Sequence, residues 1–409
     1  MLRVLIPVVL AAALMNAAMV AASAVSAIVI ADDLGPALAG LPNTAGVLGT
    51  AGGAMAVGRW TVRFGRAQAL RTGYGVGVAG GALTVLAAVG APVALLFVGM
   101  LLLGVGNAAS LLSRYAAADA VPVARRARAM STVVWASTAG AAGGPFLMAP
   151  SQSLATHLGL PALAGPFLLA LVAVFSALVA SSAVRGAPVA PAPSSTSSTR
   201  RTPVFAAAVM VVGHLVMVAL MTAVPVHVHS HGGGLGALGA MLSAHTLGMF
   251  ALSPVTGWWI DRRGTRPVVR TGLALLVLSG LLITLTGPLF TPALFLLGYA
   301  WNLCYLGGSA QLGSAELESR VESSIWTVAA VATAASPWLF TVGGFPVLAL
   351  VAVVLAVPLL VVSLALACDQ SRVLSRLAPW SCPSRRTDLV AHRSRPGRTT
   401  SPERPAGGQ

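Results

Sequence analysis

The segment Gly257-Trp258-Trp259-Ile260-Asp261-Arg262-Arg263-Gly264 resembles an earlier one, Gly58-Arg59-Trp60-Thr61-Val62-Arg63-Phe64-Gly65, at an offset of 199 residues. The match continues at the same offset, because Arg71-Thr72-Gly73 is repeated as Arg270-Thr271-Gly272. A repeat with constant spacing over this distance indicates that the chain contains two copies of one structural unit.

Twelve apolar segments surround the two copies of this repeat. A helix of about 20 apolar residues spans the hydrocarbon core of a bilayer. Only 9% of the residues are charged, and the mean hydropathy is +0.86. We therefore predict an all-α integral membrane protein with 12 transmembrane helices in two six-helix halves. The expected spans are residues 5–30, 37–59, 68–89, 92–113, 129–150, 161–183, 204–226, 235–259, 268–287, 291–312, 324–343 and 346–367.

The basic residues predict the orientation of these spans. All 25 are arginines, and they lie before the first span, after every second span and in the C-terminal tail. Positive charge gathers in cytoplasmic loops, so both termini are expected in the cytoplasm and the protein in the cytoplasmic (inner) membrane. The net charge of +15 then faces anionic headgroups, and no nucleic-acid partner is expected. Without lysine, the chain has neither a Walker loop nor a Schiff-base lysine.

Composition divides the chain into four parts. We expect an N-terminal bundle over 1–183, a cytoplasmic linker over 184–203, a C-terminal bundle over 204–367 and a disordered cytoplasmic tail over 368–409. The linker and the tail are rich in Pro and Ser, which cannot form an apolar core. Arg3, the following apolar run and Ala22-Ser23-Ala24 also fit a cleavable signal peptide, although that run continues to Ile30.

The loop motif resembles that of a known family. Gly257-x-x-x-Asp261-Arg262-x-Gly264-x-Arg266, between the eighth and ninth spans, is similar to the loop signature of the major facilitator superfamily. Gly298-Tyr299-Ala300-Trp301-Asn302 resembles its actinobacterial-type members. The resemblance covers about residues 1–367, and two halves in like orientation are typical of such transporters. It implies conformational-switch loops that contain Gly58, Arg63, Gly65, Arg66, Gly257, Asp261, Arg262, Gly264 and Arg266.

The first copy of the motif departs from the family, because Val62 stands where the signature aspartate is expected. The resemblance implies that this aspartate latches the cytoplasmic ends of the two halves together. Only Asp261 could do so here, next to the positive N-terminus of the fifth span near Met130. Alternatively, Asp261 helps only to set topology and to end its helix.

The fifth span carries Gly140-x-x-x-Gly144-Pro145, which partly resembles the motif of drug/proton antiporters in the family. Met148 replaces a glycine of that motif. Small residues let two helices approach closely, so generic helix packing is an equal alternative.

Polar residues within spans are costly in lipid and are therefore functional candidates. Helix–helix hydrogen bonding is the alternative for the amides, and snorkelling to the cytoplasmic surface is the alternative for Arg114. The substrate or proton-pathway candidates are Asn16, Asp32, Asp33, Asn107, Arg114, His214, His245, Trp301, Asn302 and Tyr305.

Three alternate histidines, His227, His229 and His231, stand at the outer end of the seventh span. Histidines in this spacing can bind a metal, but no acid or cysteine adjoins them in sequence. A pH-responsive vestibule is the better use of groups that titrate near neutrality. We therefore expect no metal and no cofactor.

Together these features predict a non-enzymatic, monomeric secondary active transporter that moves a small molecule by alternating access. Proton-coupled efflux is the favoured direction. A proton-coupled importer, or a membrane receptor or assembly protein on the same fold, remains the alternative.

Overall fold

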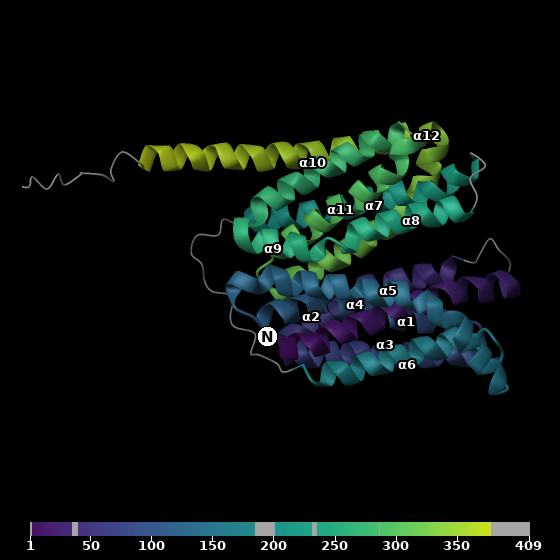
Figure 1. Cartoon of the computed structure of the whole chain (residues 1–409). Coiled ribbons are helices and arrows are strands. Elements are labelled where there is room, and N and C mark those ends of the chain that lie inside the picture. The colour runs from purple at the N-terminus through teal and green to yellow at the C-terminus, as the bar shows by residue number, and fades with distance from the viewer. Residues whose placement is uncertain (1, 35–39, 185–200, 231–234, 286, 378–409) are drawn as a thin grey trace, which may run out of the picture. The chain divides into compact units, whose positions relative to one another are not determined.

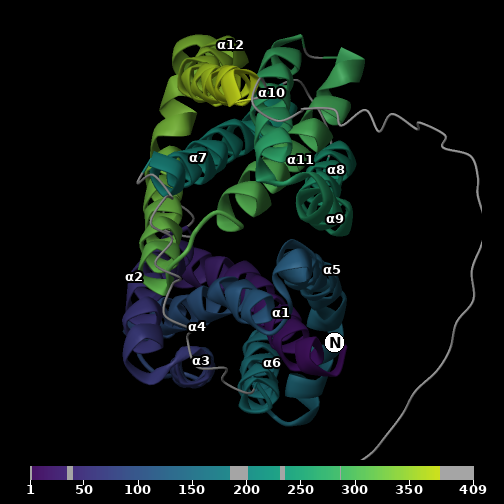
Figure 2. The same cartoon turned by 90° about the vertical axis from the view of Figure 1, so that its left-hand side faces the viewer.

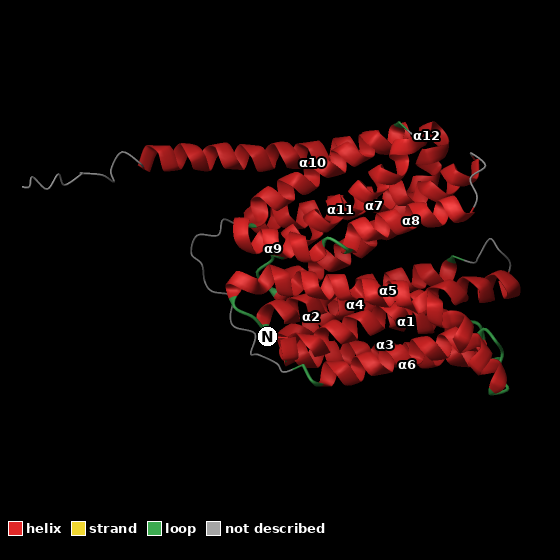
Figure 3. Ribbon diagram, viewed as in Figure 1, coloured by secondary structure: helices red, strands yellow, loops and turns green. Residues whose placement is uncertain are grey.

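The computed structural model describes residues 2–34, 40–184, 201–230, 235–285 and 287–377, and every regular element in these ranges is a helix (Figure 3). Most of the predicted linker and the end of the predicted tail lie outside the described residues. The all-α prediction with two bundles of six spans is confirmed. The described residues up to 364 belong to one compact unit, and those from 365 to 377 belong to a second.

The first six expected spans correspond to six helices that lie together as one bundle (Figure 1). Helix α4 packs against α2 and α3, and α1 packs against α5 and α6. The bounds are α1 (Leu2–Leu34), α2 (Leu41–Phe64), α3 (Arg66–Ala88), α4 (Ala94–Asp119), α5 (Arg126–His157) and α6 (Ala164–Ser182), with a 3-10 turn η2 (Val123–Arg125) before α5.

The second half differs from the expected spans in two places. The eighth span is divided into α8 and α9 near Ala251, and Pro254 lies in the first turn of α9, where it needs no amide donor. The eleventh and twelfth spans form one element, α12, which is interrupted at Gly343 and Gly344. The bounds are α7 (Arg201–Ser230), α8 (Leu235–Phe250), α9 (Ser253–Arg263), α10 (Thr265–Thr284), η3 (Gly287–Leu289), α11 (Phe290–Ser309) and α12 (Ala315–Leu377).

The interruption of α12 at Gly343 and Gly344 lies where the sequence predicts the gap between the eleventh and twelfth spans. Gly344 has a φ of 63°, which an L side chain rarely adopts. By length and composition, six helices in the described part could each cross a membrane. The remaining helices are shorter, less apolar or divided, as α8 and α9 are.

The repeat motif forms the same turn in both halves. Gly65 separates α2 from α3 with a φ of 83°, and Gly264 separates α9 from α10 with a φ of 80°. The repeated arginines also have matching roles. Arg71 donates to the Ser182 carbonyl at 2.9 Å, and Arg270 donates to the Ser363 carbonyl at 2.9 Å. Each arginine therefore binds a carbonyl of the last helix of its own half, Arg71 at the end of α6 and Arg270 within α12.

The two halves face each other within the first unit, as Figure 2 shows. We call the end of the bundles that carries Gly65, Arg125, Gly264 and Ser314 the arginine-rich end. Hydrogen bonds and ion pairs join the halves at this end, through α5 with α9, and through α3 and α4 with α12.

Candidate functional site

A cavity of about 370 Å³ lies between the two halves, within the range of small-molecule sites. Six of the predicted pathway candidates line it, three from each half: Asn16, Asn107, Arg114, His214, Trp301 and Tyr305. Other residues that line it include Ser23, Asn43, Thr50, Ser110, Ser137, Met249, Phe250, Glu322 and Trp326.

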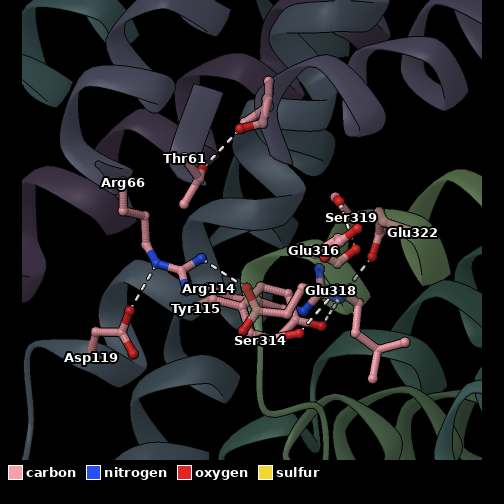
Figure 4. A network of polar contacts seen from close by, with 12 residues as sticks. Thr61, Arg66, Arg114, Tyr115, Asp119, Ser314, Glu316, Glu318, Ser319 and Glu322 are labelled. Atoms are coloured by element: carbon pink, nitrogen blue, oxygen red, sulfur yellow. Dashed lines mark hydrogen bonds and ion pairs between the residues drawn. The ribbon is translucent and has the colours of Figure 1, made fainter. Parts of the chain in front are cut away.

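An ion pair between the halves lies in the cavity wall. The Arg114 Nη2 atom is 2.7 Å from the Glu322 Oε2 atom, and both side chains are only 1% exposed (Figure 4). Arg114 also donates to the Tyr115 hydroxyl at 2.9 Å and to the Ser309 hydroxyl at 3.3 Å. Since the arginine belongs to α4 and the glutamate to α12, the pair connects the two bundles at a buried position.

Aromatic rings continue the wall from this ion pair. The Arg114 guanidinium lies 4.4 Å from the centre of the Tyr305 ring, and the Tyr305 hydroxyl donates to Glu322 Oε1 at 3.1 Å. Trp301 stacks on Tyr305 with centroids 4.7 Å apart, and its indole N–H donates to His214 Nδ1 at 2.9 Å. Trp326 lies against His214, with ring centroids 5.8 Å apart.

Two predicted candidates lie outside the cavity lining. The fully buried Asn302 amide accepts from the Thr256 hydroxyl at 2.8 Å and donates to Ser253 at 2.7 Å and to the Met249 carbonyl at 2.6 Å. His245 Nδ1 lies 3.0 Å from the Leu294 carbonyl. Both residues therefore join α11 to α8 and α9, which is the packing alternative for polar residues in spans.

Other candidates are described only in part. Asp32 and Asp33 lie in the last turn of α1, but their side chains are outside the described residues, as are the His229 side chain and all of His231. The His227 ring packs among Phe290 and Phe345, with centroids 5.1 Å and 5.0 Å away.

The sequence reasoning missed Glu322 and Trp326. It began the eleventh span at residue 324 and so left Glu322 in a cytoplasmic loop, whereas α12 begins nine residues earlier, at Ala315. One signal was available in the sequence, because Glu318 and Glu322 lie four residues apart and therefore share a helical face.

The carboxylate of Asp261 caps the start of α5, where the sequence placed it. It accepts from the amides of Ala127 at 3.1 Å and Arg128 at 3.2 Å, and from Arg128 Nε at 2.9 Å. Its side chain is 4% exposed and that of Arg128 is 44% exposed. A carboxylate at this place satisfies unpaired helix N–H groups and complements the helix dipole.

The first half repeats the close glycine contact of this site but not its ion pair. A Cβ atom built on Gly257 would lie 2.2 Å from the Ser131 hydroxyl of α5, and one built on Gly58 would lie 2.2 Å from the Ser319 hydroxyl of α12. Ser131 of α5 and Ser319 of α12 are thus equivalent. Three residues before each serine, Glu316 stands on α12 where Arg128 stands on α5. Val62 likewise stands where Asp261 stands in the second copy of the motif. Glu316 instead pairs with Arg320 on its own helix.

A different ion pair joins the halves on this side. Arg66, at the start of α3, bonds Glu318 of α12 through Nη1 at 2.9 Å and Asp119 of α4 through Nε at 2.8 Å (Figure 4). The polarity is reversed relative to the Asp261 contact: here the repeat motif supplies the cation, Arg66, and the facing helix α12 supplies the carboxylate, Glu318. An aspartate at Val62 would add negative charge to a helix start that already carries Glu316 and Glu318.

The ionisation of this pair reflects its burial. Burial raises the pKa of the Glu318 carboxyl above its ordinary value, although the Arg66 charge opposes the rise. Burial alone would lower the pKa of Arg66, but the Glu318 and Asp119 carboxylates outweigh it and raise that pKa, so the guanidinium stays charged.

Two of the predicted motif arginines, Arg63 and Arg262, contact aromatic rings on their own helices. The Arg63 guanidinium lies 5.1 Å from the ring of its neighbour Phe64, and the Arg262 guanidinium lies 5.2 Å from the Trp258 ring of its own helix. Gly140 and Gly144 face α1: a Cβ atom on Gly140 would lie 1.8 Å from the Ala13 carbonyl oxygen. The two glycines therefore permit close packing of α5 on α1. Pro145 lies within α5, and its side chain is outside the described residues.

Comparison with known proteins supports this architecture. Residues 8–317 match the model of the Major Facilitator Superfamily. The chain is 35% identical over 318 residues to the uncharacterized MFS-type transporter YdeG of Bacillus subtilis (strain 168), covering 72% of this chain and 74% of YdeG. It is 30% identical over 289 residues to the riboflavin transporter RfnT of Brucella anthropi, covering 68% of this chain and 72% of RfnT.

A solved structure shows the same fold. The Escherichia coli fucose:proton symporter FucP superposes with a TM-score of 0.67 at 15% identity, covering 88% of this chain and 98% of FucP. With the family match across most of both bundles, this chain belongs to the Major Facilitator Superfamily of multi-pass membrane transporters.

Proposed function

We propose that the chain is a proton-coupled secondary active transporter that exports a small molecule by alternating access. The observation that carries the proposal is the buried Arg114–Glu322 pair, which connects the halves in the wall of the central cavity. Breaking a buried pair by neutralising one partner costs about 3–5 kcal/mol. Protonation of Glu322 can therefore bias the equilibrium between states in which the halves are joined or parted at this point.

The arginine-rich end is the part that must open for the cavity to reach the other side of the membrane. Asp261 against α5 and Arg66 against Glu318 hold the described conformation closed there. These contacts are latches of opposite polarity, and each must break in every transport cycle. If this end is cytoplasmic, as the arginine distribution predicts, the described state faces outward.

Export is proposed from the partial resemblance of Gly140-x-x-x-Gly144-Pro145 to the antiporter motif. Uptake is the competing direction, and a receptor without flux is the competing class. The relative RfnT is a riboflavin transporter, which makes riboflavin the first compound to test.

The test is riboflavin flux in proteoliposomes under an imposed pH gradient, with internal pH recorded by a trapped dye. Exchange of riboflavin against an opposing proton gradient supports proton-coupled export, and co-movement with protons supports import. Glu322→Gln should abolish gradient-driven accumulation while exchange of labelled for unlabelled riboflavin at equal pH persists. The matched control is Glu316→Gln, because Glu316 is exposed and pairs within its own helix. Accumulation by Glu322→Gln equal to the unmodified protein would refute this coupling role.

A further inference from the structure

The two walls of the cavity differ in chemistry. Among the described lining residues, the second half supplies rings, and the first half supplies amides and hydroxyls but no aromatic ring. The rings belong to His214, Phe250, Trp301, Tyr305 and Trp326, and the polar groups to Asn16, Ser23, Asn43, Thr50, Asn107, Ser110 and Ser137.

The aromatic wall is built as a continuous surface. Trp301 stacks on Tyr305 with an interplanar angle of 16°, and Phe250 meets Trp301 edge-on with centroids 6.0 Å apart. Trp326 continues the surface beyond His214. Flat rings gain from offset stacking and edge contacts on such a surface.

The polar wall keeps unused hydrogen-bonding capacity. The Asn16 nitrogen donates to the Ser137 carbonyl at 3.0 Å, and the Asn43 oxygen accepts from Ser23 at 2.6 Å. The second polar atom of each amide has no hydrogen-bond partner within the described ranges. This wall can therefore offer both an acceptor, on Asn16, and a donor, on Asn43, to the edge of a ligand.

Trp326 adds an unpaired donor on the aromatic side. Its indole N–H is buried and has no partner in the described part of the chain, and the ring lines the cavity. A buried donor without a partner is costly, and a ligand acceptor would remove that cost.

The charges in the cavity favour a ligand without positive charge. Glu322 is bound by Arg114 and by the Tyr305 hydroxyl, so its carboxylate is already neutralised by the protein. The aromatic wall alone could attract a quaternary ammonium group. The ammonium group itself carries no acceptor, however, so its contact with the wall would leave the Trp326 N–H unpaired.

We infer that the substrate class is an uncharged planar heteroaromatic compound that carries both donors and acceptors on its edge. It stacks on the second-half wall, while the amides of the first half bind its edge. This inference rests on the proposed function, because it assigns the cargo of the same cavity.

The test is equilibrium binding to the purified protein in lipid nanodiscs without any gradient, so that its outcome is separate from transport. Riboflavin, lumichrome and theophylline are planar, uncharged probes, while L-fucose and choline lack a heteroaromatic ring. Binding is followed by quenching of flavin or tryptophan fluorescence, and by calorimetry for fucose and choline. At least one planar probe should bind with a Kd below about 1 mM, and fucose and choline should bind at least about 10-fold more weakly.

Variants then locate the binding. Trp326→Leu should weaken the planar probe about 10-fold, and Trp326→Phe should weaken it less, because an aromatic ring remains, although it is smaller and lacks the N–H. The matched control is Trp258→Leu, whose ring lies on α9 and is 45% exposed. Binding of none of the three planar probes, equal binding of choline or fucose, or an unchanged Kd in Trp326→Leu would overturn the inference. Riboflavin binding without gradient-driven flux would refute the transport proposal and leave this inference standing.

Discussion

Replacing Asp261 by Asn tests whether the contact at the start of α5 holds the arginine-rich end closed. The carboxylate accepts two backbone amides and the Arg128 guanidinium, and its own side chain is nearly buried. The substitution keeps one acceptor oxygen but removes the charge. The aim is to measure how far the two halves then part.

The magnitude follows from these contacts. The guanidinium bond is worth little, because Arg128 is 44% exposed and solvent screens it, about 0.2–1 kcal/mol. Loss of one charge-assisted amide bond costs about 1.5 kcal/mol, and the helix dipole contributes about 0.5 kcal/mol. A total of about 2.2–3 kcal/mol changes the equilibrium about 40- to 160-fold. A closed-to-open ratio of about 99:1 would fall to between about 2.5:1 and about 1:1.6.

Single-molecule energy transfer in nanodiscs measures this ratio. One fluorophore is attached at Val123→Cys, which is 75% exposed in the first half. The other is attached at Gly313→Cys in the second half, where an added Cβ meets nothing within 4 Å. The native cysteines Cys304, Cys368 and Cys382 are first replaced by alanine.

The control is Glu316→Gln, which removes an exposed carboxylate at the same end and should change the ratio less than about threefold. The latch reasoning fails if Asp261→Asn leaves the ratio unchanged, or if the control shifts it equally.

Four further outcomes are expected. Gly58→Ala should shift the same energy-transfer distribution toward the open state and slow flux, because a Cβ there would lie 2.2 Å from Ser319 of α12. Gly52→Ala on the same helix is the control: its Cβ meets nothing within 4 Å, so it should have no effect. Arg66→Ala should destabilise the detergent-solubilised protein by about 3–5 kcal/mol by leaving a buried carboxylate unpaired, and Glu318→Gln in that background should recover part of the loss in thermal unfolding. Because burial raises the pKa of Glu318, the folded form binds more protons than the unfolded form at pH values between the ordinary and the raised pKa. The free energy of unfolding should therefore fall as pH rises through that window. Glu318→Gln should flatten this dependence of stability on pH. Asn302→Leu should lower thermal stability by about 2–4 kcal/mol, because it leaves the polar partners of the amide unpaired, while the Kd of a planar probe stays unchanged.

Much of the candidate site followed from residue type and depth alone. Arg114, His214, Trp301 and Tyr305 were candidates because polar and amphipathic groups are rare inside spans, and all four line the cavity. The same argument also selected Asn302, which instead joins helices of one half. Depth in the membrane does not determine which side of a helix faces the cavity, so the sequence alone could not separate the two cases.

The sequence by itself determined the helical bundles, the duplicated halves and the turns at Gly65 and Gly264. These depend on local hydropathy, on residue spacing and on a positive φ, all of which can be read within a short stretch of chain. Only the tertiary structure decided that Glu322 meets Arg114, 208 residues away, and that Arg66 replaces the missing aspartate with a pair of opposite polarity. Contacts between the two halves depend on the register in which separate helices pack, and no local property of the sequence specifies that register.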